Sequence, residues 1–133
     1  MGMTQPPDTV TLSIYLPYAP PRVLCGNGRP AHWAVKNRAS NDFHDSVCAM
    51  AREIAPTEPL AAVVVKYVSM YCGKQLDRDN LIIGMKPALD ALTTARVIED
   101  DSPEFVKDIK VEYERVPHRD QMGVRMEIIE VLT

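Results

Sequence analysis

The sequence predicts an α+β protein, in which a small mixed β-sheet packs with two main helices in the order β-α-β-α-β-β. Four short segments are rich in β-branched residues or alternate apolar and polar residues, as strands do. Between them lie two segments whose apolar residues recur at helical spacing. The chain has 133 residues, of which 46% are apolar and 25% charged, so we expect one domain over residues 1–133. Residues 1–8 are expected to be a disordered or extended N-terminus.

In chain order the expected elements are a strand (9–17), a loop rich in Pro and Gly (18–30), a helix (31–55), a central strand (59–72), a helix ending near residue 95, and two strands (105–116 and 123–132) joined as a hairpin by 117–122. Pro56 and Pro59 end the first helix. Gly84 and Pro87 interrupt the second, so we expect either a kink or a new helix start with Pro87 near its first position.

Composition excludes several classes of protein. The longest apolar run, from Leu60 to Val65, is too short to cross a bilayer. The N-terminal sequence lacks the basic end and apolar core of a signal peptide. The three cysteines are widely spaced and form no CxxC pair, which is typical of reduced thiols. We therefore expect a cytoplasmic protein with no membrane contact and no organic cofactor.

The charges are divided unevenly along a chain whose net charge is −3. No acidic residue occurs between Thr9 and Asn41, and all but one of the 18 acidic residues lie from Asp42 onward. A solvated surface of mixed charge would explain such a division. The alternative is that one face binds phosphates while acidic residues elsewhere hold a metal. The candidate DNA-binding residues of the basic segment are Arg22, Asn27, Arg29, His32, Lys36 and Arg38. Trp33, which lies among them, is expected to be a core anchor.

The segment "QLDRDNLIIGMKPALD" at residues 75–90 carries charges that packing alone does not require. At about 100° per residue, Asp79, Lys86 and Asp90 fall within a helical stripe about 40° wide. Each charge has a simpler explanation: Asp79 or Asn80 as a helix N-cap, Lys86 with Asp90 as an i,i+4 ion pair, and "EDDSPE" at 99–104 as a surface turn.

A single explanation for these charges is a divalent-metal site. Mg²⁺ and Mn²⁺ prefer carboxylate oxygens and water, and carboxylates from different elements form such sites. A nearby lysine would stabilise negative charge on a scissile phosphate. No EF-hand, Walker A, GxGxxG, HExxH or GxSxG motif is present. The chemistry indicated is phosphoryl transfer to water.

The segment "DRDNLIIGMKPALDALTTARVIEDD" at 77–101 resembles the RusA family of Holliday-junction resolvases, which share a DxDN start, a downstream lysine, a "DAL" and a closing "DD". The segment "NGRPAHWAVKNR" at 27–38 is similar to the N-x-R-x-HW segment of phage-type members. In the compact form of the family the lysine follows the DN pair by one helical turn. Here it follows by about two, so Lys86 should keep its face but shift along the axis.

The resemblance implies a homodimeric endonuclease that resolves four-way DNA junctions by paired nicks, using Mg²⁺ or Mn²⁺. By position it implies Asp77, Asp79 and Asp101 as metal ligands and Lys86 as the catalytic lysine. Asp90 and Asp100 match supporting positions. The alternatives are a metal-dependent nuclease for flaps or other branched DNA, a phosphodiesterase, a DNA-binding dimer without cleavage activity, and an ion-free structural protein.

Overall fold

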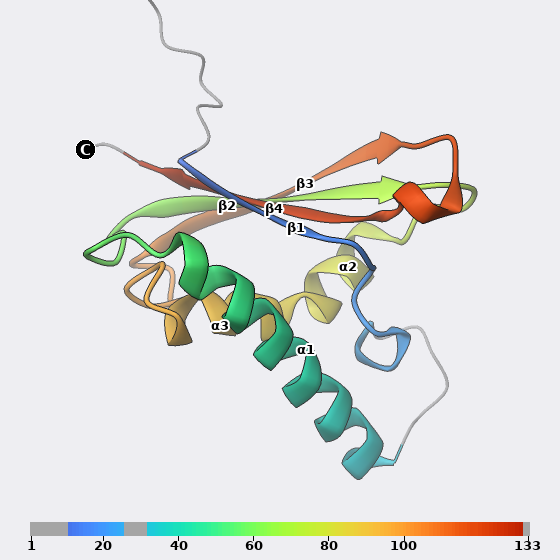
Figure 1. Ribbon diagram of the computed structural model, residues 1–133, viewed down its shortest axis with the longest axis horizontal. Helices are drawn as coiled ribbons and strands as arrows, with labels where there is room; N and C mark the ends of the chain where they lie inside the picture. The colour runs from blue at the N-terminus through green and yellow to red at the C-terminus, as the bar shows by residue number, and fades with distance from the viewer. Residues whose placement is uncertain (1–10, 26–31, 132–133) are drawn as a thin grey trace, which may run out of the picture.

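The computed structural model describes residues 11–25 and 32–131, and it has the α+β architecture that the sequence predicts (Figure 1). In chain order the elements are β1 (Leu12–Leu16), the 3₁₀ turn η1 (Arg22–Leu24), α1 (Trp33–Ile54), β2 (Val63–Tyr71), α2 (Arg78–Gly84), α3 (Lys86–Thr94), β3 (Val106–Arg115), the 3₁₀ turn η2 (Arg119–Gln121) and β4 (Gly123–Glu130).

The four strands form one mixed sheet in the order β1-β4-β2-β3. β2 is a central strand, as predicted, and pairs parallel with β3 and antiparallel with β4. The predicted hairpin between the last two strands is wrong, because β2 lies between β3 and β4. The burial patterns agree with this order. β4 has one exposed residue, at its end, and pairs on both sides, whereas β3 exposes charged residues along its length and forms an edge.

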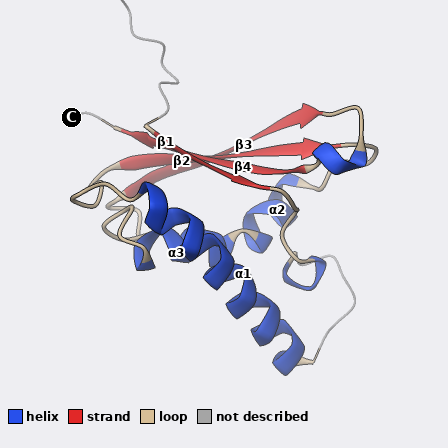
Figure 2. Ribbon diagram, viewed as in Figure 1, coloured by secondary structure: helices blue, strands red, loops and turns tan. Residues whose placement is uncertain are grey.

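The helices cover one face of the sheet (Figure 2). The hydrophobic core lies between the two layers and extends in sequence from Ile14 to Ile128. Val47 of α1 and Leu92 of α3 are fully buried against inward-facing residues of β2 such as Tyr67. Because α3 follows β2 and precedes β3, the segment with the clustered charges is the crossover between two parallel strands.

The second predicted helix is two helices, α2 and α3, which meet at Met85. Of the two expected arrangements, a new helix start is confirmed, because Pro87 lies in the first turn of α3. Proline is tolerated there since the first amides of a helix have no partner within it.

The prediction that Trp33 anchors the core is wrong. The indole is 72% exposed, and Val35 is 57% exposed. The buried residues of α1 begin at Phe43, so only the C-terminal part of the helix packs on the core. Its N-terminal end extends away from the sheet (Figure 1), which leaves the apolar residues there without a layer to pack against.

Candidate functional site

The first predicted metal ligand, Asp77, is the N-cap of α2. Its backbone is non-helical, and its Oδ2 accepts a hydrogen bond from the backbone N–H of Asp79 at 3.2 Å. The cap was expected at Asp79 or Asn80, so that prediction is wrong by two or three residues. Capping therefore accounts for Asp77 without a metal, and it satisfies an amide that the helix leaves unpaired.

Asp79 lies in the first turn of α2, where a carboxylate is favoured by the helix dipole. Its side chain is 82% exposed, and its Oδ1 lies 3.6 Å from the guanidinium of Arg78. An ion pair so exposed stabilises the fold little, by about 0–1 kcal/mol. Apart from this favourable interaction with the helix dipole, Asp79 makes only a weak contact with Arg78, and its carboxylate is open to solvent.

Lys86 brings the later charged residues of the motif together. At the start of α3, its Nζ donates to Asp90 Oδ1 at 2.9 Å, the i,i+4 pair that the spacing predicts. Nζ also donates to Oδ2 of Asp101, which lies beyond the end of α3. One ammonium group therefore connects the helix with the "EDD" segment. Asp100, the neighbour of Asp101, is half-buried.

The backbone after α3 places Asp101 beside Lys86. Arg96 has a φ of 63°, a left-handed conformation that reverses the chain after the helix. Leu60 then donates to the carbonyl of Val97 at 2.9 Å and accepts from the N–H of Glu99 at 3.0 Å. These bonds hold the chain just before Asp101 against a segment that precedes β2.

The contact between Lys86 and Asp101 shifts the pKa of both groups. The hydrogen bond from Lys86 holds the pKa of Asp101 below its usual range, and a hydrogen bond with Asp90 acts in the same direction. The hydrogen bond to Asp101 is the main cause that raises the pKa of Lys86; burial acts against it, and the hydrogen bond to Asp90 adds to the rise. At neutral pH the lysine is therefore a cation and Asp101 an anion.

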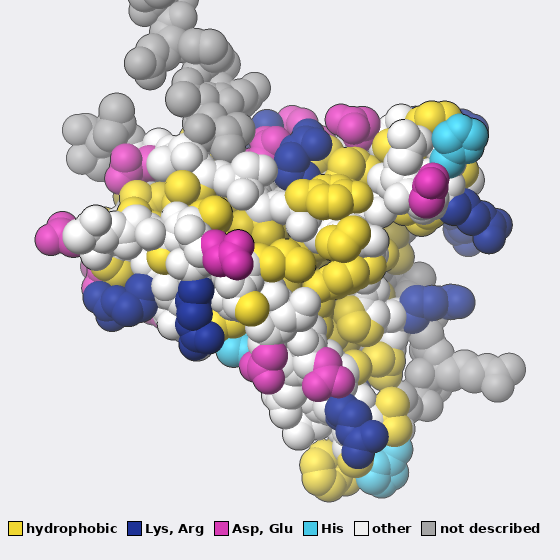
Figure 3. Space-filling view, viewed as in Figure 1, with side chains coloured by type: hydrophobic (Ala, Val, Ile, Leu, Met, Phe, Trp, Pro, Cys, Tyr) yellow, Lys and Arg dark blue, Asp and Glu magenta, His cyan; other side chains and the backbone are white. Residues whose placement is uncertain are grey.

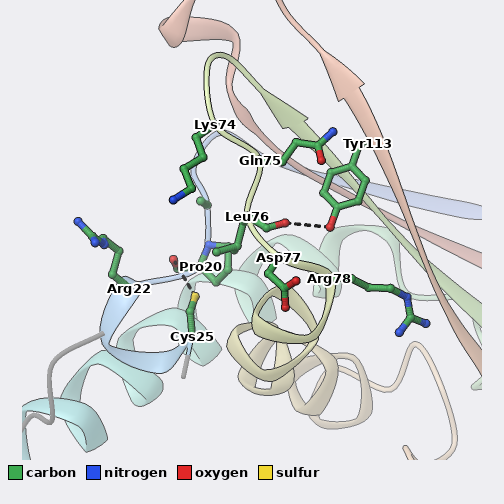
Figure 4. A pocket seen from close by; sticks show the side chains of 10 residues that line it. Pro20, Arg22, Cys25, Lys74, Gln75, Leu76, Asp77, Arg78 and Tyr113 are labelled. Carbon is green, nitrogen blue, oxygen red and sulfur yellow. Dashed lines mark hydrogen bonds between the residues drawn. The ribbon is translucent and has the colours of Figure 1, made fainter. Parts of the chain in front are cut away.

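Asp77 also lines an open pocket of about 740 Å³ between the β1–α1 connection and the start of α2. Three basic residues, Arg22, Lys74 and Arg78, line the same pocket. Figure 4 shows Arg22 and Lys74 on one side of it, with Asp77 across from them and the Arg78 side chain directed away. The pocket is therefore lined by one carboxylate and by three basic residues.

Two contacts fix the walls of this pocket. The Tyr113 hydroxyl of β3 donates to the carbonyl of Leu76 at 2.8 Å, which holds the residue just before Asp77 (Figure 4). Burial raises the pKa of Tyr113, and the charge of Asp77 raises it further. On the other wall, Gly84 of α2 packs so closely on Cys25 that a Cβ at position 84 would lie 2.6 Å from the Sγ atom.

The predicted DNA-binding residues lie in two places. Arg22 is in the pocket beside Asp77. His32, Lys36 and Arg38 are exposed at the projecting end of α1, where His32 caps the helix by accepting from the N–H of Ala34 at 3.2 Å. Asn27 and Arg29 lie outside the described residues.

Sequence reasoning missed Lys74, Arg78 and Tyr113. Arg78 stands within the "DRDN" motif, and Lys74 lies three residues before the start of the motif, so a count of basic residues around the motif would have indicated both. Tyr113 carried no such signal, because its approach to Leu76 depends on the parallel pairing of β2 with β3.

The residues present fit a magnesium ion by the chemistry of their donor atoms. Mg²⁺ is commonly held by one or two carboxylates together with water and substrate phosphates, and Asp77 and Asp79 offer exposed carboxylates two residues apart. Among residues 11–25 and 32–131, no three His, Cys, Asp or Glu side chains are grouped closely enough to hold a metal by themselves. The assignment of Asp77, Asp79 and Asp101 to one ion stays a prediction.

No protein-family model and no curated protein matches this chain. The resemblance to the RusA family therefore rests on the motif residues alone. No helix in the described part of the chain is long and apolar enough to cross a membrane.

Proposed function

We propose that this protein is a metal-dependent endodeoxyribonuclease that resolves four-way DNA junctions during recombination and repair in the bacterial cytoplasm. The observation that carries the proposal is the contact of Lys86 with both Asp90 and Asp101. These residues match separate positions of the RusA-like motif. The i,i+4 spacing alone explains the contact with Asp90, but a local explanation of each charge does not require that Lys86 also meet Asp101.

The proposed roles follow from the chemistry of each side chain. Asp77 and Asp79 would hold Mg²⁺ or Mn²⁺, with Asp101 as the third ligand that the resemblance implies. The metal, when bound, supplies Lewis-acid stabilisation of the phosphate and activation of a water molecule. Lys86 is protonated at neutral pH, so it acts as a cation that stabilises negative charge at the phosphate rather than as a general base. Asp90 positions this ammonium group.

The basic lining of the pocket provides for DNA binding. Carboxylates alone would repel phosphates. Arg22 and Lys74 offset that repulsion across the pocket from Asp77, and Arg78 does so beside Asp79. Such contacts position the backbone of DNA without reading its sequence. A homodimer would place two such sites on symmetry-related strands of a junction, as paired nicking requires.

The test compares cleavage of a synthetic four-way junction with cleavage of a linear duplex, each with Mg²⁺ and with a chelator. We expect Mg²⁺-dependent nicking of the junction and little cleavage of the duplex. Asp79→Asn should keep junction binding and abolish nicking, whereas Asp120→Asn, an exposed change in η2, should cleave as the wild type does. Wild-type rates for Asp79→Asn would contradict the site assignment.

One observation favours a second candidate, a DNA-binding dimer without cleavage activity. Two of the three predicted ligands already have protein partners, since Asp77 caps α2 and Asp101 binds Lys86. Tight junction binding with no nicking in either Mg²⁺ or Mn²⁺ would support this candidate. Cleavage of flaps in preference to four-way junctions would instead indicate a nuclease for other branched DNA.

A further inference from the structure

The projecting end of α1 exposes the only tryptophan of the chain. Trp33 is 72% exposed, although a tryptophan buries a large apolar area when it packs in a core. Every described residue from His32 to Arg38 is exposed. Because the fold leaves this ring uncovered, its role lies outside the hydrophobic core.

Trp33 also borders a shallow groove of about 450 Å³. The other residues that line it are Leu24, Lys36, Asn37 and Ser40. Leu24 is buried in the core, so it forms an apolar floor at the base of the groove. The His32 ring lies 5.8 Å from the indole between centroids, at an interplanar angle of 31°. The groove therefore has an aromatic wall, an apolar floor and polar groups at its rim.

The charged residue that lines this groove is basic, Lys36, and the groove lies at the end of a basic segment of the sequence. No acidic residue occurs between Thr9 and Asn41, although the whole chain has a net charge of −3. The amides at the N-terminus of α1 carry a partial positive charge, and no acidic residue in the first turn offsets it. Figure 3 shows hydrophobic, basic and histidine side chains together at the tip of the molecule, over the N-terminal end of α1, with acidic side chains next to them on the side toward the sheet. This combination matches a ligand that is both anionic and aromatic.

We propose that Trp33 is a stacking platform for an unpaired nucleobase of the DNA substrate, with Lys36 and Arg38 on the adjoining phosphates. The inference rests on the proposed function and deepens it. Proteins bind unpaired strands by combining basic grooves with aromatic rings on which bases stack. Bases at the exchange point of a junction are those most accessible to such a ring, because stacking along each duplex is interrupted there.

The test uses Trp33 as its own reporter, since it is the only tryptophan. The full chain is titrated in a chelator, so that no cleavage occurs, with a thymidine oligonucleotide, a fully paired duplex and a four-way junction. We expect the oligonucleotide and the junction to quench tryptophan fluorescence more than the duplex does. In anisotropy measurements with labelled oligonucleotide, Trp33→Ala should raise Kd about five- to 150-fold, the range that base–aromatic stacking contributes.

Two variants control this measurement. Trp33→Phe keeps an aromatic face and should retain most of the affinity. Tyr15→Ala removes an aromatic ring that is 48% exposed on β1, away from the groove, and should bind as the wild type does. An unchanged Kd for Trp33→Ala, or equal quenching by the paired duplex, would overturn the proposal.

A second copy of the chain is the other occupant to be distinguished. An emission maximum that shifts to the blue with rising protein concentration, without DNA, would assign Trp33 to a contact between copies and overturn the proposal. Failure of the proposed function is separate. If single strands quench the fluorescence but the protein shows no Mg²⁺-dependent nicking, the proposed nuclease function is wrong and the stacking site is still supported. If Trp33→Ala nicks at the wild-type rate with an unchanged Kd, the stacking site is wrong and the nuclease function is still supported.

Discussion

Lys86 and Asp101 form an ion pair that joins the first residue of α3 to the turn that precedes β3. Asp90 accepts from the same ammonium at 2.9 Å. The lysine side chain is 59% exposed, so solvent screens both interactions. Such a pair stabilises a fold by about 0–1 kcal/mol, and its main effect is to fix where the charges lie.

Lys86→Met should therefore separate stability from activity. We expect the free energy of unfolding to fall by no more than about 1 kcal/mol in urea titrations, while junction nicking is lost because no cation remains at the phosphate. Lys86→Arg keeps the charge and should fold equally well, with partial activity. A loss of several kcal/mol in Lys86→Met would show that the lysine is structural.

Metal binding should be measurable without any cleavage. A ligand at 100 times its Kd stabilises the native state by about 2.7 kcal/mol, so Mg²⁺ should raise the Tm of the wild type in calorimetry and a chelator should reverse the effect. Asp79→Asn should reduce the shift and Asp120→Asn should not. Equal shifts in the two variants would place the ion elsewhere.

Gly84→Ala should destabilise the fold because its Cβ would lie 2.6 Å from Cys25 Sγ and 3.1 Å from Pro20. Overpacking of this kind costs about 1–3 kcal/mol. Cys25→Ala removes the sulfur, so the double variant should recover part of the loss. A double-mutant cycle on the free energy of unfolding measures the coupling, and additive effects would mean that α2 and the β1–α1 connection do not meet as described.

Cys25 should be an unreactive thiol with a defined pH dependence. Burial raises its pKa above 9.0, against a smaller effect of Arg22, so the thiolate is scarce at pH 8. Peptide mapping after iodoacetamide treatment should show slower alkylation of Cys25 than of the half-buried Cys72, and urea should abolish the difference.

The raised pKa of Cys25 also makes the stability of the fold depend on pH. Because the pKa is higher in the folded than in the unfolded state, the contribution of the buried thiol to stability is present below the unfolded pKa and is lost as pH rises through the folded pKa. The wild type should therefore lose more stability than Cys25→Ala between pH 8 and pH 11. Parallel curves would contradict the burial of this thiol.

Local patterns predicted local structure well. The alternation of apolar residues gave strands where β1 and β4 are found, and the i,i+4 spacing gave the contact between Lys86 and Asp90. The fresh helix start at Pro87 was one of two expected arrangements, since a proline without an N–H restricts the backbone on local grounds alone.

Long-range relationships could not be predicted in the same way. The insertion of β4 between β1 and β2 depends on which edges remain open after the crossover forms, whereas the short connection between β3 and β4 favoured a hairpin when only the sequence was considered. The exposure of Trp33 depends on where the sheet layer ends rather than on helical spacing. Asp101 reaches Lys86 because Leu60 holds the backbone near Val97, a contact between segments far apart in sequence.

The crossover between β2 and β3 contains every residue from Asp77 to Asp101, and it contributes nothing to the hydrogen bonds between those two strands. Its length can therefore change by whole helical turns while each strand keeps its partner residues. The extra helical turn between Asp79 and Lys86, relative to the compact form of the family that the motif resembles, would be such a change. In this arrangement, the distance between Asp79 and Lys86 can change in evolution while the pairing of the sheet stays the same.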